Sequence, residues 1–223
     1  MSKRRPLTRE RVLQTAMKMA DRNGLDGLSM RALGQALGVE AMSLYNHVAN
    51  KDDLLDGLVD LVFAEFELPL DAPLWQEAML ARARSIRAVL AKHPWALGLL
   101  ESRANPGPGT LTHHDAMIGV LRRAGFTVAG TAHALAALDA YIYGFVLTEQ
   151  RLPFDTGPGA AEMAERMLPA LAGSPYPHFV EFVTEHVLQP GYDYGEEFLF
   201  GLQLLLDGLE RLRLRGLAPG RTE

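Results

Sequence analysis

The chain has 223 residues, 48% of them hydrophobic and 22% charged, which is the balance of a folded globular protein rather than a disordered one. It contains no cysteine, which excludes a disulfide framework, thiolate zinc sites and a cysteine nucleophile. No apolar run approaches the roughly 18 residues of a membrane span, and the basic N-terminus leads into no apolar signal segment. We therefore expect a cytoplasmic protein that has no membrane partner.

The net charge of −5 is divided unevenly along the chain. Residues 1–51, which we call the head, hold nine Lys or Arg and four Asp or Glu, so the head carries +5 and the remainder −10. This asymmetry suggests a polyanion-binding head on a body that DNA would repel. Lys3, Arg4 and Arg5 would either enter a minor groove or form a disordered, solubilising end.

Helical periodicity dominates the head, and no alternation of apolar and polar residues indicates a strand. Thr8 is placed to cap a first helix that Asn23-Gly24 ends, and Ser29 to cap a second that ends at Gly38. A third, short helix is expected over residues 40–47. The inward-facing residues are expected to be Val12, Ala16, Met19 and Ala20 in the first helix, Leu33, Ala36 and Leu37 in the second, and Ala41, Leu44 and Val48 in the third.

A fourth helix begins after Asn50, with Asp53 in a capping-box-like role. The Pro-containing stretch 68–73 separates it from the rest of the chain. We predict an all-α protein with a helix-turn-helix domain (1–51), a connecting helix (52–67) and a larger domain (68–223). Further helices are expected over residues 75–93, 95–101, 110–124, 127–150, 160–172, 179–187 and 196–215, with loops at 105–109 and 152–159.

The segment 29–47 has the proportions of a helix-turn-helix, with Gly38 in the tight turn. If the inward set of the third helix is correct, its other side chains point outward. These are Met42, Ser43, Tyr45, Asn46 and His47. A solvated helix would show Lys and Glu there, whereas short uncharged donors and an aromatic ring suit base edges and phosphates. A turn between two packing helices is the alternative reading of the spacing.

Residues 27–39 (GLSMRALGQALGV) and 43–55 (SLYNHVANKDDLL) closely resemble the DNA-binding signature of the TetR family. Shorter pieces of the body resemble the regulatory domain of tetracycline repressors. They lie at 75–76, 125–126, 144–147, 198–202 and 208–210. The resemblance implies a transcriptional regulator whose partners are double-stranded operator DNA and a small-molecule effector. It also implies that the protein has no enzymatic activity and no cofactor.

The resemblance assigns roles within the head. Arg31 is expected to read a guanine, and Tyr45 and Lys51 to contact phosphates, with Lys51 helped by a helix N-terminus. Ser29 would cap its helix and also bind phosphate. The remaining expected DNA contacts are Met30, Ala41, Met42, Ser43, Asn46 and His47. Ala41 and Met42 depart from the polar residue and proline of the tetracycline repressors, which implies a different operator.

Such heads act in pairs on two half-sites, so we expect a homodimer. The segment 196–215 is apolar around most of its circumference, and 127–150 carries small residues that permit close approach: Ala132, Ala134, Ala136, Ala137 and Ala140. The resemblance implies that these two helices form an intersubunit four-helix bundle. An ordinary core within one chain would also explain the leucines.

The resemblance also locates an effector pocket. Its lining is expected from Arg82, Ile86, Leu97, Leu100, Arg103, His113, Met117, Leu135 and Asp139, with Met163 and Met167 from the other subunit. Tetracycline repressors bind a drug–Mg²⁺ chelate through a His and a Glu, and those positions hold Leu100 and Thr148 here. No metal is therefore expected, and adjacent His113 and His114 face different directions on a helix. The pocket would suit a largely hydrophobic molecule with a polar or acidic group, although its apolar members would also serve as core.

Three other functions compete with a ligand-released repressor. An enzyme is disfavoured because no phosphate-binding loop, His-Glu-x-x-His or nucleophile elbow is present. A dimeric DNA-binding protein without a ligand, and an activator of the same architecture, both remain open.

Overall fold

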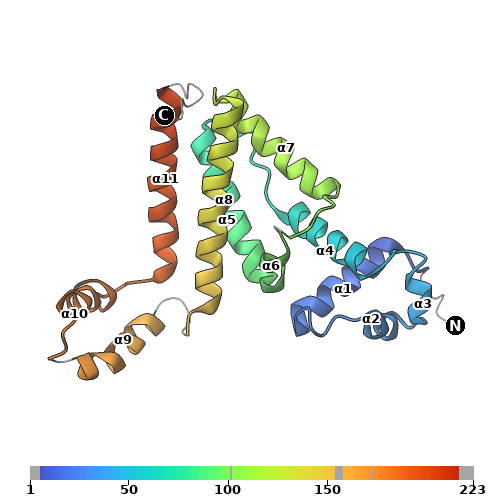
Figure 1. Ribbon diagram of the computed structural model, residues 1–223, viewed down its shortest axis with the longest axis horizontal. Coiled ribbons are helices and arrows are strands. Elements are labelled where there is room, and N and C mark those ends of the chain that lie inside the picture. The colour runs from blue at the N-terminus through green and yellow to red at the C-terminus, as the bar shows by residue number, and fades with distance from the viewer. Residues whose placement is uncertain (1–5, 101, 154–157, 172, 216–223) are drawn as a thin grey trace, which may run out of the picture. The chain divides into compact units, whose positions relative to one another are not determined.

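The computed structural model describes residues 6–100, 102–153, 158–171 and 173–215, and every regular element in these ranges is helical. They form two compact units, one ending at Gly125 and one beginning at Phe126 (Figure 1). The first unit thus contains the head, the connecting helix and the first part of the body. No helix within the described residues has both the length and the apolar character needed to cross a bilayer. The tail Lys3-Arg4-Arg5 lies outside the described residues.

The first helix, α1 (Arg9–Asn23), begins where predicted, because the Thr8 hydroxyl accepts a hydrogen bond from the N–H of Arg11. It ends at Gly24, whose φ of 67° favours glycine. Its buried residues are Val12, Leu13, Ala16, Met17 and Ala20. The prediction was wrong for Met19, which is only half-buried, because the buried face runs through Leu13 and Met17 instead.

The helix-turn-helix consists of α2 (Met30–Leu37) and α3 (Ala41–Leu44). Ser29 caps α2 by accepting from the N–H of Ala32, and Gly38 turns the chain with a φ of 70°. Gly34 is buried in place of the predicted Ala36, which is exposed. A Cβ at Gly34 would lie 3.0 Å from the Val39 carbonyl oxygen and 3.2 Å from the Ala41 Cα, so this glycine allows α2 and α3 to pack closely.

The helix α3 is shorter than the predicted 40–47, since residues 45–47 form a turn. Ala41 is only half-buried, whereas Leu44 and Val48 are fully buried. The N–H groups of His47 and Val48 both donate to the Leu44 carbonyl oxygen, so the chain turns here before Asn50 caps the next helix. Of the three residues predicted to face inward, only Leu44 is buried within α3 itself.

The connecting helix is α4 (Lys51–Glu65), and Asn50 caps it by accepting from the N–H of Asp53. The rest of the first unit comprises α5 (Trp75–Lys92), the 3-10 turn η1 (Pro94–Ala96), α6 (Leu97–Leu100) and α7 (Pro108–Arg123). The loop predicted over residues 105–109 ends earlier than expected, because α7 already begins at Pro108. Proline is tolerated there, since the first helical N–H needs no partner in the helix.

The second unit begins with α8 (Val128–Arg151), capped by Thr127. It continues with α9 (Pro158–Leu171), α10 (Pro177–Phe182), the π-helical turn η2 (Val183–Val187), the 3-10 turn η3 (Tyr194–Glu196) and α11 (Glu197–Leu214). The long helices α8 and α11 pack side by side. The Tyr141 hydroxyl of α8 lies 3.1 Å from the Glu197 carbonyl oxygen and 3.0 Å from that of Phe198, which joins α8 to the start of α11.

Candidate DNA-binding surface and ligand-site residues

The predicted DNA contacts lie on one local stretch of the chain, from the start of α2 to the start of α4. Six of them are exposed: Ser29, Arg31, Met42, Tyr45, Asn46 and Lys51. Four are partly buried: Met30, Ala41, Ser43 and His47. Met42 exposes 74% of its surface, so its side chain is free to contact a partner. Buried Leu44 anchors α3 beneath this surface. The outward set is therefore available to a partner.

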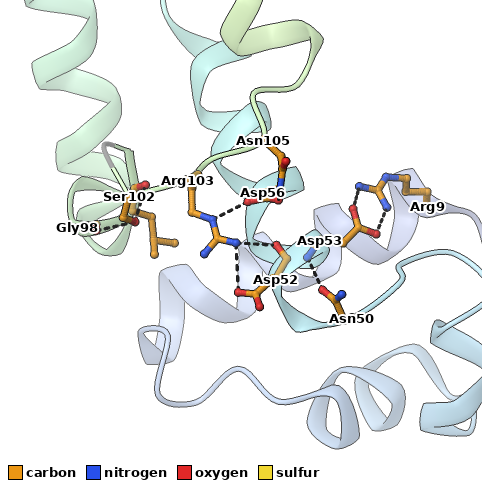
Figure 2. Close-up of polar contacts among 10 residues, drawn as sticks. Arg9, Asn50, Asp52, Asp53, Asp56, Gly98, Ser102, Arg103 and Asn105 are labelled. Atoms are coloured by element: carbon orange, nitrogen blue, oxygen red, sulfur yellow. Dashed lines mark hydrogen bonds and ion pairs between the residues drawn. The ribbon is translucent and has the colours of Figure 1, made fainter.

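Sequence reasoning missed an ion pair that joins the first helix of the head, α1, to the connecting helix α4. The Arg9 guanidinium donates to both carboxylate oxygens of Asp53, at 2.9 Å and 2.6 Å (Figure 2). It also donates to the His47 carbonyl oxygen at 3.0 Å. Asp53 also accepts from the N–H of Ala49. The hydrogen bond from Arg9 is the main reason that the pKa of Asp53 lies below its ordinary value, against the opposing effect of burial. The turn after α3 is thereby tied to both α1 and α4.

The expected capping box is therefore altered. Asn50 caps α4 as predicted, but the Asp53 carboxylate accepts from Ala49 and Arg9. The sequence shows an acidic residue at position 53, which could have indicated an ion pair. No local pattern identifies its partner as an arginine 44 residues away.

A second polar network joins the segment after α6 to the first turns of α4. Arg103 Nε donates to Asp56 at 2.6 Å, and its terminal nitrogen donates to the carbonyl oxygen of Asp52 at 3.1 Å and its carboxylate at 3.2 Å (Figure 2). Asn105 also donates to Asp56. The hydrogen bond to Asp56 raises the pKa of Arg103 above its ordinary value. Arg103, predicted as a pocket residue, thus holds α4.

Arg82 of α5 and His113 of α7 form a buried pair in the same unit. They expose 2% and 1% of their surfaces, and Arg82 Nε donates to His113 Nε2 at 3.0 Å. The rings of Phe63 and Phe66 lie 5.6 Å and 5.3 Å from the imidazole. Burial, then the charge of Arg82, lowers the pKa of His113 to about 3. The imidazole is neutral, and its Nδ1 has no hydrogen-bond partner among the described residues.

The other predicted pocket residues fall into two groups. Ile86, Leu100 and Met117 are buried and Leu97 is half-buried in the first unit, whereas Leu135, Asp139, Met163 and Met167 belong to the second. A surface groove of about 620 Å³ beside α7 includes none of these residues. The composition of the complete pocket stays a prediction.

No cluster of three His, Asp or Glu side chains able to hold a metal occurs among the described residues. His113 and His114 have different surroundings, as the helical spacing predicts. His113 is buried against Arg82, whereas exposed His114 lies 2.8 Å from the Thr110 carbonyl oxygen through its Nδ1. Leu100 and Thr148, which the resemblance assigns to the positions of the metal-directed His and Glu, carry neither an imidazole nor a carboxylate.

The helices α8 and α11 each carry an apolar face that remains exposed. Phe200 and Leu204 of α11 expose 66% and 58% of their surfaces, although Phe198, Leu202 and Leu206 of the same helix are buried. On α8 the exposed residues include three of the predicted small ones: Ala132, Ala136 and Ala140. An ordinary core explains Ala134 and the buried leucines but leaves this second face unexplained.

Comparison with known proteins identifies the two parts of the chain. A model described as "Bacterial regulatory proteins, tetR family" matches residues 12–58, and one described as "Tetracyclin repressor-like, C-terminal domain" matches residues 68–213. The HTH-type transcriptional repressor DrrR1 of Streptomyces coeruleorubidus is 35% identical over 215 residues, which are 92% of this chain and 78% of that protein. The tetracycline repressor protein class C of Escherichia coli is 32% identical over 212 residues, 93% of each chain.

Solved structures of TetR-family proteins have the same fold as this chain. The TetR family protein ActR of Streptomyces coelicolor in complex with (S)-DNPA has a TM-score of 0.78 and 29% identity, covering 93% of this chain and 98% of that one. The family is shown by two observations. Two family models together match most of the chain, and relatives above 30% identity match more than nine-tenths of it. The chain belongs to the TetR family of bacterial transcriptional regulators, with an N-terminal DNA-binding domain of that family and a tetracycline-repressor-like C-terminal domain.

Proposed function

We propose that this protein binds a palindromic operator as a homodimer and leaves it when a largely hydrophobic small molecule enters the C-terminal domain. The observation that carries the proposal is the exposed set on α2 and α3, held beneath by Leu44 and fixed at its end by Arg9 and Asp53. One short recognition helix buries too little surface for specific affinity, so two heads are needed. The exposed apolar faces of α8 and α11 support pairing of two copies through these helices.

Within each head the roles divide by chemistry. Arg31 is exposed at the start of α2, where a guanidinium is suited to the O6 and N7 atoms of guanine. Lys51 lies at the first position of α4, so its ammonium and the free backbone N–H groups are available to the same phosphate. Tyr45, Asn46 and His47 supply further polar contacts, and Met42 an apolar contact suited to a thymine methyl group.

The effector is proposed to be hydrophobic with one polar or acidic group. Two structures of ActR, with (S)-DNPA and with actinorhodin, are ligand complexes of a family member, at 29% and 30% identity to this chain. In this chain Ile86, Leu100 and Met117 are buried in the same unit as the Arg82–His113 pair. Leu100 and Thr148, which the resemblance assigns to the chelate-binding positions, carry neither an imidazole nor a carboxylate. The effector is therefore not expected to be a tetracycline chelate.

We propose that effector binding is transmitted to the DNA-binding domain through a movement of α6 that shifts α4. Arg103 follows α6 and bonds to Asp52 and Asp56 near the N-terminus of α4, which directly follows the recognition turn. A ligand that favours another position of α6 would move α4 with it, and the two recognition helices would lose the half-site spacing. Such coupling between two sites has typical magnitudes of about 1–3 kcal/mol.

Two measurements test the proposal. Selection of duplexes from genomic fragments, followed by footprinting, should yield a palindrome with two half-sites about one helical turn apart. A thermal-shift screen of hydrophobic acids and neutral analogues should yield compounds that raise the melting temperature and also release that duplex. A protein that enriches no duplex contradicts the DNA-binding role. A protein that binds the duplex but responds to no compound supports the ligand-independent dimer, and increased transcription from a promoter carrying the operator supports the activator.

A further inference from the structure

His93 lies at the junction of α5 and η1, between two carboxylates from different parts of the first unit. Its Nδ1 is 2.6 Å from Asp21 Oδ1 of α1, and its Nε2 is 3.3 Å from Glu65 Oε2 at the end of α4. The side chain exposes 2% of its surface, whereas those of Asp21 and Glu65 expose 28% and 34%. The imidazole therefore connects the C-terminal ends of α1 and α4 to the junction of α5 and η1.

Each carboxylate has a second partner that keeps it in place. The Trp95 indole N–H donates to Asp21 Oδ1 at 2.7 Å, and the Lys92 ammonium donates to Glu65 Oε2 at 2.6 Å. Burial opposes the ionisation of Glu65, but the hydrogen bonds and charges of Lys92 and His93 outweigh it, so the pKa of Glu65 lies below its ordinary value. The groups facing the imidazole are thus two acids, with a lysine and an indole behind them.

The two ring nitrogens occupy different edges of one rigid imidazole, so a single side chain contacts both carboxylates. Because the ring is buried, these two contacts fix the separation of Asp21 and Glu65. A glutamine at position 93 carries one amide group on a flexible stem, so it cannot hold both carboxylates in the same geometry.

We propose that His93 is a positioning residue that fixes α1, and with it the recognition turn, relative to α5 and α6. The inference rests on the proposed binding of two half-sites by two heads. With Asp21 and Glu65 both bound, each head is held at one angle, and two heads in a dimer match one half-site spacing. Without His93, each head still recognises its own half-site but is not oriented for the second.

A packing role is the alternative, because a buried imidazole fills space whether or not it orients anything. Packing affects the stability of the fold and hence all DNA binding equally. Orientation affects only the advantage of two half-sites over one. The ratio of affinity for the full operator to affinity for a single half-site therefore separates the two roles.

The experiment uses full-length protein and the palindromic duplex that the wild type selects, beside the same duplex with one half scrambled. The variants are His93→Gln, Asp21→Asn and Glu65→Gln, and the matched control is His178→Gln, whose side chain is 95% exposed. We expect His93→Gln to lower affinity for the palindrome on the order of tenfold, within the usual range for coupled sites, with little change for the half-site. Asp21→Asn and Glu65→Gln should each lower the ratio by a smaller factor while the ring stays in place.

The possible outcomes distinguish a positioning role of His93 from a packing role. If His93→Gln lowers both affinities equally, or lowers only the melting temperature, the residue is a packing residue and the proposal is wrong. If His93→Gln fails to fold, an unchanged ratio in both Asp21→Asn and Glu65→Gln overturns the proposal, and a lowered ratio supports it. If the wild type selects no duplex at all, the proposed function itself fails. An unchanged ratio beside normal wild-type binding rejects the role of His93 alone.

Discussion

Thr110 donates two hydrogen bonds to Asp60, through its backbone N–H at 2.8 Å and its hydroxyl at 3.1 Å, both to the same carboxylate oxygen. A side chain in the middle of α4 thus satisfies the first turn of α7, where free N–H groups need acceptors. The approach is close, because a Cβ at Gly109 would lie 2.6 Å from the Asp60 carbonyl oxygen. The two helices can pack in this way only with glycine at position 109.

The first prediction follows from that contact. Gly109→Ala should destabilise the protein by about 1–3 kcal/mol, the usual cost of overpacking, because a backbone atom of α4 would have to move. Gly98→Ala is the matched control, since nothing lies within 4 Å of a Cβ there. Urea unfolding should show a lower midpoint for Gly109→Ala and no loss for Gly98→Ala. Equal stability of the two variants would contradict the packing argument.

The second prediction separates base reading from phosphate binding. Arg31→Ala should lose about 1–3 kcal/mol at one base pair of each half-site and relax specificity there. Lys51→Ala should weaken binding evenly across sequences and reduce the salt dependence by about one phosphate contact. Anisotropy titrations with a panel of single-substitution operators at several salt concentrations provide the test. The same profile for both variants would refute these roles.

The third prediction concerns the connection between α6 and α4. Arg103→Gln removes the charge that bonds to Asp52 and Asp56, so an effector found in the screen should still bind but should release operator less efficiently. Arg84→Gln, at an exposed position of α5, is the control. Effector affinity is measured by calorimetry and release by anisotropy. A parallel loss of effector binding and release would instead place Arg103 in the pocket, as the family resemblance implies.

The fourth prediction is a pH dependence of stability. The pKa of His113 is about 3 in the folded protein against 6.5 for the model compound, so the unfolded chain binds a proton that the folded protein excludes. This contribution to stability is complete above pH 6.5 and decreases as the pH falls toward 3, with a slope of at most about 1.4 kcal/mol per pH unit. His113→Gln should therefore lose less stability than the wild type between pH 6.5 and 5. Parallel urea-unfolding midpoints for the two proteins over that interval would contradict it.

The fifth prediction tests pairing through α8 and α11. Leu204→Glu places a charge on the exposed apolar face of α11 and should shift the protein from dimer to monomer in light scattering, with loss of affinity for the full operator. Leu111→Glu is the matched control, because Leu111 of α7 is 57% exposed and lies outside that face. Monomer formation by both variants, or by neither, would argue against this interface.

The helix ends could be predicted from sequence because their causes are local. Thr8, Ser29 and Asn50 each bond to a backbone N–H three residues further along the chain, so spacing alone identifies them. The length of α3 could not be predicted in the same way. Helical periodicity continues through residues 45–47, and Leu44 and Val48 are both buried at helical spacing, so the pattern does not show that the helix already ends in a turn after Leu44.

The polar contacts that fix the candidate site were also beyond sequence reasoning. Arg9 and Asp53 are 44 residues apart and Arg103 and Asp56 are 47 apart, and no periodic pattern states which surface charges will meet. Arg82 and His113 were identified through family resemblance, which pointed to each position but not to their hydrogen bond. Local chemistry thus predicts elements and caps, whereas ion pairs depend on the packed fold.

The brevity of α3 has a consequence for how this repressor can change over generations. Its attachment to the core depends on Leu44, with Val48 in the following turn, while Met42 and Asn46 project outward. Substitutions at those two positions should therefore alter which promoter is recognised at little cost to stability, since surface changes away from buried features usually fall within about 0.5 kcal/mol. After gene duplication, a copy could acquire a new operator while its fold and its effector remained the same.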